Sequence, residues 1–207
     1  MKEELLLEWA KKIKSISQIG LTYGTGPYDL ERYHQLSDLA DEMFTAIGQM
    51  DLTSIQKIFL GDSGYATPKV DLRGSFIQDG KILLVKERSD GRWTLPGGWA
   101  DVCESPAQGI QREILEESGF QVKVNKCVAV LDRNLGAYEP VYPHHVYKLL
   151  FLCECTGGEK KLNIEIEDID FFAQDALPTL STERVIQRDI DLLFAHHADT
   201  SLPVTFE

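Results

Sequence analysis

The chain has 207 residues, of which 43% are hydrophobic and 26% charged, a balance typical of a folded globular protein. Its 33 acidic and 21 basic residues give a net charge of -12, which argues against tight binding to nucleic acid, because such binding depends on basic side chains. No apolar run approaches the roughly 20 residues of a membrane span, and the acidic N-terminal segment lacks the apolar core of a signal peptide. We therefore expect a cytoplasmic protein that neither crosses a membrane nor forms a stable nucleic-acid complex.

The first part of the chain, residues 1–62, carries helical periodicity and almost no strand signal. Apolar residues recur there at every third or fourth position, which is the pattern of amphipathic helices. The predicted helices cover residues 5–20, 29–47 and 53–60. We expect Gly20 to end the first helix and Asp29 to cap the second. Three small helices bury little surface alone, so we expect this all-α domain to dock on the rest of the chain or on a second copy.

The second part, residues 63–207, has the strand and helix patterns of an α/β domain. A segment rich in Gly, Ser and Pro at 61–69 separates it from the helices, and Asp79-Gly80 predicts a tight turn between its first two strands. The predicted strands are 72–77, 82–86, 122–131, 146–155 and 168–173, and the predicted helices are 105–119 and 181–197. Strands interleaved with helices in this order predict a sandwich with a mixed sheet.

One helix of this domain has strong boundary signals. Ser105 is placed to cap it, Pro106 takes its first position and Gln108 completes a capping box with Ser105. Gly119 supplies the stop. Within the helix, Glu113, Glu116 and Glu117 stand at i, i+3 and i+4, so that three carboxylates share one face.

Three carboxylates on one helix face repel one another at neutral pH unless a cation lies among them. A hard divalent ion, Mg²⁺ or Mn²⁺, is the natural partner of such oxygen ligands. The alternative is a solvated acidic face, which would be preferred for a helix standing alone. Here, however, Pro96-Gly97-Gly98 precedes the helix, and glycines allow a backbone to approach a ligand closely.

The residues from Gly98 to Phe120 follow a specific pattern. In order, the segment contains Gly98, five residues, Glu104, seven residues, Arg112-Glu113-Ile114, one residue, Glu116-Glu117, one residue and Gly119-Phe120. This order fits the Nudix box without a departure. The chain thus resembles the Nudix hydrolase family. The resemblance implies an α/β fold, an α/β/α sandwich with a mixed sheet, here preceded by a small all-α domain. It also implies Mg²⁺- or Mn²⁺-dependent hydrolysis of a nucleoside diphosphate linked to another moiety, X.

The same resemblance assigns roles to the residues of the box. It makes Glu113, Glu116, Glu117 and the Gly97 carbonyl metal ligands, and it pairs Glu104 with Arg112 as a structural link. Gly98 and Gly119 take structural places in the motif. The attacking nucleophile is water, and its proton goes either to Glu116 or to a glutamate on a later loop, for which Glu165 is the better candidate and Glu167 the other.

The outer segments resemble one Nudix subgroup. Three segments outside the box resemble those of Nudix enzymes with an N-terminal helical domain, which include CDP-choline pyrophosphatase-like proteins. They are the helical front, GYATPKVDLRG at 64–74 and HHVYKLLFLCECTGGE at 144–159. This implies a homodimer and a small nucleotide substrate, with CDP-choline, cleaved to CMP and phosphocholine, first and ADP-ribose second. Candidate substrate contacts are Arg73 and Arg133 for phosphate, and Tyr142 and His144, in an aromatic loop, for a base or a quaternary ammonium.

Two other classes of function compete with this hypothesis. An RNA-end nuclease could use the same metal chemistry, although the net charge of -12 argues against long RNA. A noncatalytic sensor could bind a nucleotide-like ligand on the same fold. The intact box and the lack of a basic recognition helix argue against that alternative.

Overall fold

The computed structural model describes residues 2–48 and 50–207, which form two compact units. The helical unit contains the chain up to Pro68 together with Pro140–His145, and the sheet unit contains Lys69–Glu139 and Val146–Glu207. The loop 140–145 therefore belongs to the helical unit, although it is part of the second domain expected from the sequence. Among the described residues, no helix has the length and apolar character that a membrane crossing requires.

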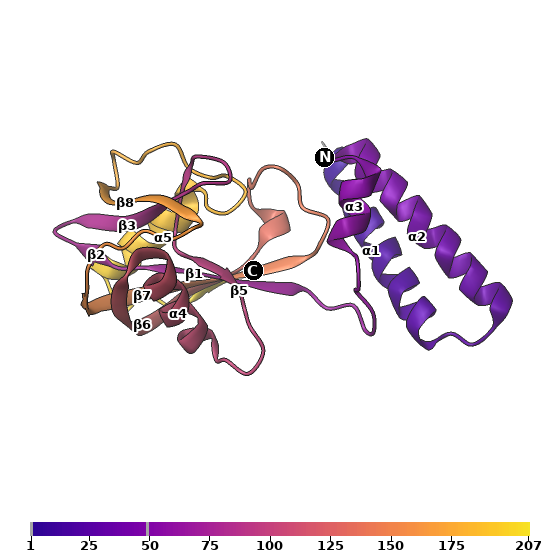
Figure 1. The fold of residues 1–207 in the computed structure, drawn as a ribbon, viewed down its shortest axis with the longest axis horizontal. Coiled ribbons are helices and arrows are strands. Elements are labelled where there is room, and N and C mark those ends of the chain that lie inside the picture. Colours follow the sequence, from indigo (N-terminus) through magenta and orange to yellow (C-terminus); the bar gives the residue numbers. More distant parts are fainter. Residues whose placement is uncertain (1, 49) are drawn as a thin grey trace. The chain divides into compact units, whose positions relative to one another are not determined.

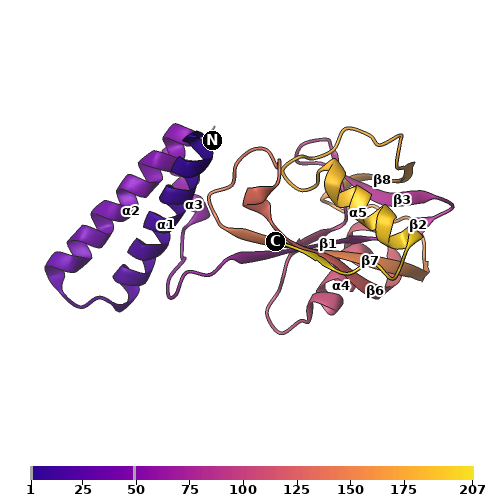
Figure 2. The ribbon, with the colours of Figure 1, turned by 180° about the vertical axis from the view of Figure 1, so that it is seen from behind.

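The helical unit is built from α1 (Lys2–Tyr23), α2 (Pro27–Ile47) and α3 (Leu52–Ile58), and α1 and α2 lie side by side along their length (Figures 1 and 2). The first helix does not end at Gly20 as predicted. A Cβ at this position would lie 2.4 Å from Cδ1 of Tyr33, so the glycine serves close packing between the helices. Gly26 occupies the N-cap of α2, and Asp29 lies in its first turn instead.

The sheet unit holds two sheets. The first has the order β5-β1-β7-β6-β9 and the second the order β2-β3-β4, with β8 paired to β3. The strands are β1 (Lys69–Ser75), β2 (Ile77–Gln78), β3 (Lys81–Glu87), β4 (Trp93–Thr94), β5 (Gly97–Trp99), β6 (Phe120–Asp132), β7 (Val146–Gly158), β8 (Ile166–Ala173) and β9 (Thr205–Phe206). Strand β1 runs parallel to β7 and antiparallel to β5, which confirms the mixed sheet. The turn at Asp79-Gly80 has positive φ at both residues, as its sequence predicts.

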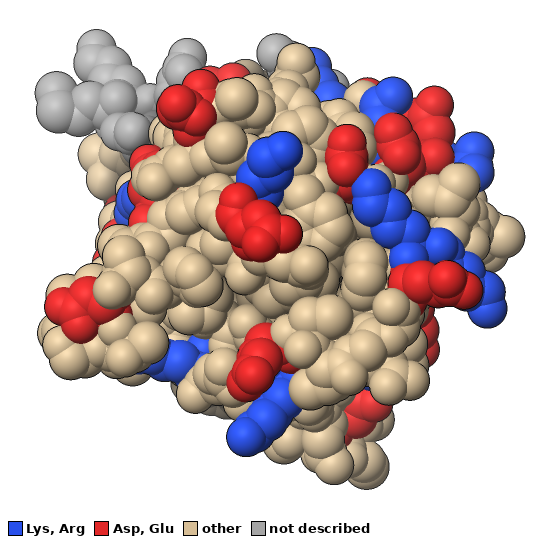
Figure 3. Space-filling model, turned by 90° about the vertical axis from the view of Figure 1, so that its left-hand side faces the viewer, with Lys and Arg blue, Asp and Glu red and all other residues tan. Residues whose placement is uncertain are grey.

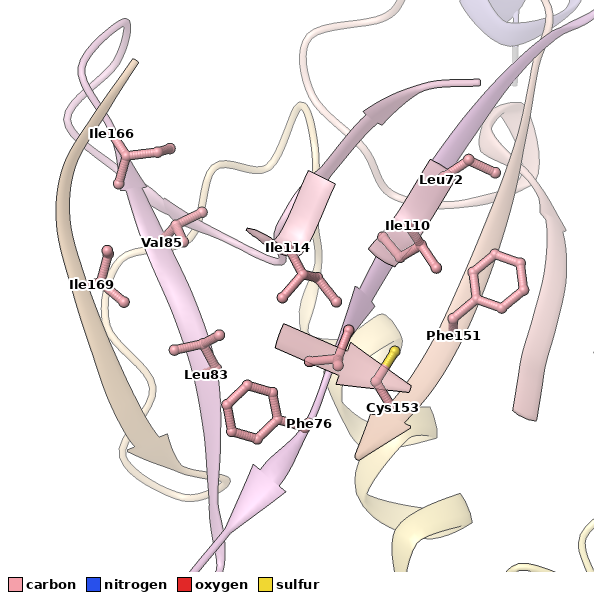
Figure 4. Packing of buried hydrophobic residues seen from close by; sticks show 11 residues of the cluster. Leu72, Phe76, Leu83, Val85, Ile110, Ile114, Phe151, Cys153, Ile166 and Ile169 are labelled. Carbon is pink, nitrogen blue, oxygen red and sulfur yellow. The ribbon is translucent and has the colours of Figure 1, made fainter. Parts of the chain in front are cut away.

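Two helices, α4 (Pro106–Ser118) and α5 (Gln187–Ala198), cover the sheets and define two cores. Alternate side chains of β7 pack in one core or in the other. Phe151 and Cys153 pack in the core of α4, which Figure 4 shows, whereas the residues at 150 and 152 pack in the core of α5. The structure confirms the α/β/α sandwich preceded by helices. Helix α5 begins at Gln187 and not at 181, because the segment before it forms turns around Ser181.

Charge is mixed on one face of the molecule. On the face shown in Figure 3, basic side chains are interspersed with acidic ones and do not gather in one patch.

Candidate active site

The helix that carries the three carboxylates has the boundaries that its sequence predicts. The Oγ of Ser105 accepts a hydrogen bond from the Gln108 N–H at 3.3 Å, and the Gln108 Oε1 accepts one from the Ser105 N–H at 2.9 Å. Gly119 ends the helix with φ 79°. Ile110 and Ile114 are fully buried, and their burial fixes the rotation of the helix about its axis.

The backbone of Gly97 and Gly98, the first two residues of β5, lies directly against this helix. The N–H of Gly97 donates to Oε2 of Glu117 at 3.0 Å, and a Cβ on Gly98 would lie 3.2 Å from Oε1 of Glu113. Gly97 has φ 141°, and a Cβ there would lie 1.9 Å from the Leu72 carbonyl oxygen. Only glycine fits this close approach, so the two glycines bring the β5 backbone up to two of the carboxylates.

The carboxylate of Glu117 is the most deeply placed of the three. The residue is 7% exposed, and burial raises its pKa to about 8, with the charges of Glu113 and Glu87 adding to the effect. The charge of Arg73 and the Gly97 hydrogen bond act in the opposite direction. Burial raises the pKa of Glu113 too, against the charge of Arg112. These two carboxylates would therefore gain stability from a cation placed beside them.

Arg112 joins the loop before α4 to the acidic face. Its Nε donates to Oε1 of Glu104 at 3.0 Å and its Nη2 to Oε2 of the same residue at 3.1 Å, a forked contact. Its Nη1 donates to Glu113 and to Glu116, each at 3.0 Å, and its Nη2 also reaches Asp101. The hydrogen bonds to Glu104 hold the pKa of the guanidinium above its usual range.

The donor chemistry of this face suits a hard divalent cation. It consists of carboxylate oxygens on Glu113, Glu116 and Glu117 and of the adjacent β5 backbone, all of them oxygen ligands. Within the described part of the chain, no three acidic, His or Cys side chains converge closely enough to enclose an ion by themselves. Mg²⁺ usually takes only one or two protein carboxylates and completes its shell with water and substrate phosphate, so the residues present fit such an ion.

The loop before β8 adjoins the C-terminal end of α4 and is held there by Asn163, a residue that the sequence analysis did not identify. The Nδ2 of Asn163 donates to the Glu116 carbonyl oxygen at 2.9 Å. Its Oδ1 accepts from the backbone N–H groups of Glu165 at 2.8 Å and Ile166 at 2.7 Å. The structure thus ties the loop of the exposed Glu165 to the helix of Glu116, but an asparagine in a polar loop gives no signal that singles it out.

Glu87, at the end of β3, is another residue that sequence reasoning missed. Its Oε1 lies 3.4 Å from Nε of Arg184, and burial raises its pKa against the charges of Arg184 and Arg73. It adjoins the loop of Glu165, since the Arg88 N–H donates to the Glu165 carbonyl oxygen at 2.8 Å. It therefore adds negative charge close to Glu117, as the raised pKa of that residue records.

The two arginines predicted to bind phosphate are both buried, each with 7% of its surface exposed. The Nε of Arg73 donates to both carboxylate oxygens of Asp71, and its Nη1 donates to the Leu95 carbonyl oxygen. The Nη2 of Arg133 donates to the Glu183 carbonyl oxygen at 3.3 Å. The role of either arginine as a phosphate contact stays a prediction.

The aromatic loop residues Tyr142 and His144 belong to the helical unit and not to the unit of the carboxylates. The Nε2 of His144 lies 2.8 Å from Oδ2 of Asp62, and its ring centroid lies 4.5 Å from that of Phe59. The Tyr142 ring lies 5.8 Å from the ring of His144. In this structure both residues pack within the helical unit.

The fold and the acidic helix that follows Gly97 and Gly98 are those of a Nudix domain. The chain matches a family model described as NUDIX domain over residues 72–193, and one described as UDP-X-like, N-terminal oligomerisation domain, over residues 4–59. The chain belongs to the Nudix hydrolase family and is an enzyme of that family.

Two similar proteins match nearly the whole chain, and a third matches about two thirds of it. One, from Bacillus subtilis (strain 168), is named "Putative ADP-ribose pyrophosphatase YjhB" and is 38% identical over 188 residues, 91% of this chain and 90% of the relative. A crystal structure of a UDP-X diphosphatase is 33% identical, with a TM-score of 0.63 and complete coverage of both chains. The structure of an ADP-ribose pyrophosphatase from Streptococcus suis 89-1591 is 35% identical, with a TM-score of 0.62, and covers 68% of this chain and 100% of that one.

Proposed function

We propose that this Nudix enzyme hydrolyses the pyrophosphate bond of a nucleoside diphosphate linked to a sugar, with ADP-ribose as the first candidate substrate. The observation that carries the proposal is the buried carboxylate of Glu117, held against the Gly97 backbone beside Glu113. Such a group is suited to a cation, because a cation relieves the cost of burying negative charge on a helix face and can itself bind the phosphates of a substrate.

Glu113, Glu116, Glu117 and the carbonyl of Gly97 would hold Mg²⁺ or Mn²⁺. When bound, the ion would neutralise the charge of the pyrophosphate and orient it for in-line attack. Arg112 would keep Glu113 and Glu116 in position through the contacts of 3.0 Å that it makes to each. Its forked contact with Glu104 would prevent the loop before α4 from moving away from the helix.

A carboxylate must accept the proton of the attacking water, and two glutamates can do so. Glu116 stands on α4 with its side chain 56% exposed. Glu165 stands on the loop that Asn163 fastens to the Glu116 carbonyl. The carboxylate of Glu116 or of Glu165 would take the proton from the attacking water. Because water is the nucleophile, no covalent intermediate is expected. Since Glu116 is also a proposed metal ligand, Glu116→Gln and Glu165→Gln are compared at saturating Mg²⁺, and the base is the residue whose replacement removes the acidic limb of the pH profile of kcat.

The names of the relatives favour ADP-ribose over CDP-choline as the first substrate. Two of the relatives described above are named as ADP-ribose pyrophosphatases, and none of the three is named for CDP-choline. CDP-choline remains a prediction from the sequence, and so does a location in the cytoplasm.

A homodimer would cover an apolar stripe of the helical unit. Trp9, Ile16 and Tyr23 follow one another at seven-residue steps on α1 and are 48%, 56% and 65% exposed. A seven-residue step returns to nearly the same side of a helix, so these side chains form one stripe. The description of the matching N-terminal family model as an oligomerisation domain supports a second copy of this chain as the partner.

The proposed substrate is tested by mass spectrometry with a panel of ADP-ribose, a UDP-sugar, CDP-choline, a nucleoside triphosphate and a short 5′-phosphorylated RNA. Each is incubated with the full chain in Mg²⁺, in Mn²⁺ and in EDTA. We expect AMP and ribose 5-phosphate as the fastest products, and none in EDTA. Faster release of CMP and phosphocholine would replace ADP-ribose by CDP-choline, and selective cleavage of RNA would contradict the proposed substrate class.

A further inference from the structure

We propose that Arg73 is a positioning residue for the Gly97 carbonyl and not a contact for substrate phosphate. The inference rests on the proposed function, because it concerns how the chain presents one of the proposed metal ligands. It assigns a task to a buried arginine that the sequence analysis offered as a candidate phosphate contact.

The backbone pairing of β1 and β5 determines where Gly97 points. Gly97 is paired with Arg73 in an antiparallel register. The Gly74 N–H donates to the Pro96 carbonyl oxygen at 3.1 Å, and the Ala100 N–H donates to the Val70 carbonyl oxygen at 2.8 Å. Since hydrogen-bonded and non-hydrogen-bonded pairs alternate in an antiparallel ladder, Gly97 occupies a non-hydrogen-bonded pair.

The amide and carbonyl of a residue in such a pair both point away from the neighbouring strand. The N–H of Gly97 does so, since it donates to Glu117 on α4. The Gly97 carbonyl is therefore also directed away from β1 and is available as a ligand. Its direction depends on how firmly the preceding residues, Leu95 and Pro96, are held.

Arg73 holds the first of these residues. Its Nη1 donates to the Leu95 carbonyl oxygen at 3.2 Å, while Pro96 is held by the backbone of β1. The guanidinium is itself fixed, because its Nε donates to the two oxygens of Asp71 at 3.0 and 3.2 Å. Two successive carbonyls are thus fastened to β1 before the chain reaches Gly97.

The shape of the guanidinium matters as much as its charge. Arg73 contacts Asp71 with one nitrogen and Leu95 with another, in directions set by a rigid planar group. A lysine ammonium would keep the charge but could not reproduce the two directions from one point. The charge of Asp71 is also met by Lys148, which is 1% exposed and hydrogen-bonded to the same carboxylate. Loss of the Arg73 contact would therefore leave the Leu95 carbonyl oxygen with only the Thr94 hydroxyl, 3.2 Å away, as its side-chain donor among the described residues, while Asp71 would still have a cation beside it.

The test measures Mn²⁺ affinity by electron paramagnetic resonance on the full chain without substrate. Arg73→Lys is compared with the wild type and with Arg133→Lys, a matched control at a second arginine that is also 7% exposed in the same unit. We expect Arg73→Lys to weaken Mn²⁺ binding about 10- to 100-fold and Arg133→Lys to leave it within about twofold.

A folded Arg73→Lys protein with wild-type Mn²⁺ affinity would overturn the inference and leave the proposed function intact. A wild type that binds no Mn²⁺ would instead refute the proposed metal site. If Arg73→Lys does not fold, nuclear magnetic resonance of the wild type provides the second measurement. Addition of Mg²⁺ should change the chemical shifts of both the Gly97 amide and the Arg73 Nε–H. An unchanged Arg73 signal beside a shifted Gly97 signal would contradict the proposed link between Arg73 and the Gly97 carbonyl.

Discussion

Replacement of Glu117 by glutamine should abolish activity and, at alkaline pH, stabilise the metal-free protein. Burial raises the pKa of this carboxyl from an ordinary 4.5 to about 8. The folded chain therefore keeps a proton that the unfolded chain loses above pH 4.5. Since the folded state binds more protons in this window, stability falls as pH rises from about 4.5 to about 8.

The size of the effect follows from the shift. A rise from 4.5 to about 8 corresponds to a cost of up to about 5 kcal/mol once the carboxylate is charged in both states. Glutamine carries no charge, and its Oε1 can still accept the hydrogen bond of the Gly97 N–H, which is 3.0 Å long in the wild type. We expect Glu117→Gln to exceed the wild type by about 2 to 5 kcal/mol above pH 8 and to equal it near pH 4.5.

Urea unfolding in EDTA at both pH values measures this difference, and Glu116→Gln is the matched control. Glu116 is 56% exposed, so its removal should change stability by less than about 1 kcal/mol. Added Mg²⁺ at pH 8 should stabilise the wild type more than Glu117→Gln, because the variant lacks a ligand. A Glu117→Gln protein that is no more stable than the wild type above pH 8, or one with wild-type turnover, would refute the reasoning.

Four further outcomes are expected. Gly97→Ala should lose at least about 3 kcal/mol, because its Cβ would lie 1.9 Å from the Leu72 oxygen; a melting temperature close to wild type would contradict this. Ser105→Ala should cost about 1 kcal/mol in urea unfolding through loss of the cap, and no change in midpoint would argue against the cap. Ile16→Asp should convert the proposed dimer to monomers in light scattering, and a variant that stays dimeric would contradict the stripe as the interface. Asn163→Asp keeps the acceptor for the loop but loses the Nδ2–H donor, so kcat should fall about tenfold if Glu165 is the base, whereas unchanged kcat would favour Glu116.

The parts of the site that the sequence predicts are local. The capping box of Ser105, the stop at Gly119 and the shared face of the carboxylates all depend on residues less than one helix length apart. Propensity and spacing determine such features before any tertiary contact forms. For this reason the helix ends at the residues that its pattern indicates.

The features that sequence analysis missed depend on long-range packing. Five consecutive residues of β1, from Asp71 to Ser75, are buried, so Arg73 has no solvent face in either direction of the strand. Alternation reveals only one buried face, and an isolated arginine then looks like a surface cation. Helix α1 continues past Gly20 for a similar reason, since Tyr33 of the next helix packs against that glycine.

The distribution of residues between the two units was also beyond the sequence. Tyr142 and His144 lie between β6 and β7 in the chain, yet the partners of His144, Asp62 and Phe59, come from the helical front, and Tyr142 packs on His144. No pattern near residue 140 indicates a contact made some 80 positions earlier in the chain. A loop rich in aromatic and imidazole groups is consistent with ligand binding and with packing, and here the observed contacts are packing.

The measurement that tests the central claim most directly is hydrolysis of ADP-ribose in water enriched in oxygen-18, with and without Mg²⁺, using the wild type and Glu117→Gln. The account predicts Mg²⁺-dependent release of AMP and ribose 5-phosphate, with one labelled oxygen in one of the two phosphates and at least a 100-fold loss in the variant. Turnover that persists in EDTA, or equal rates for wild type and Glu117→Gln, would contradict a metal site on the acidic face of α4.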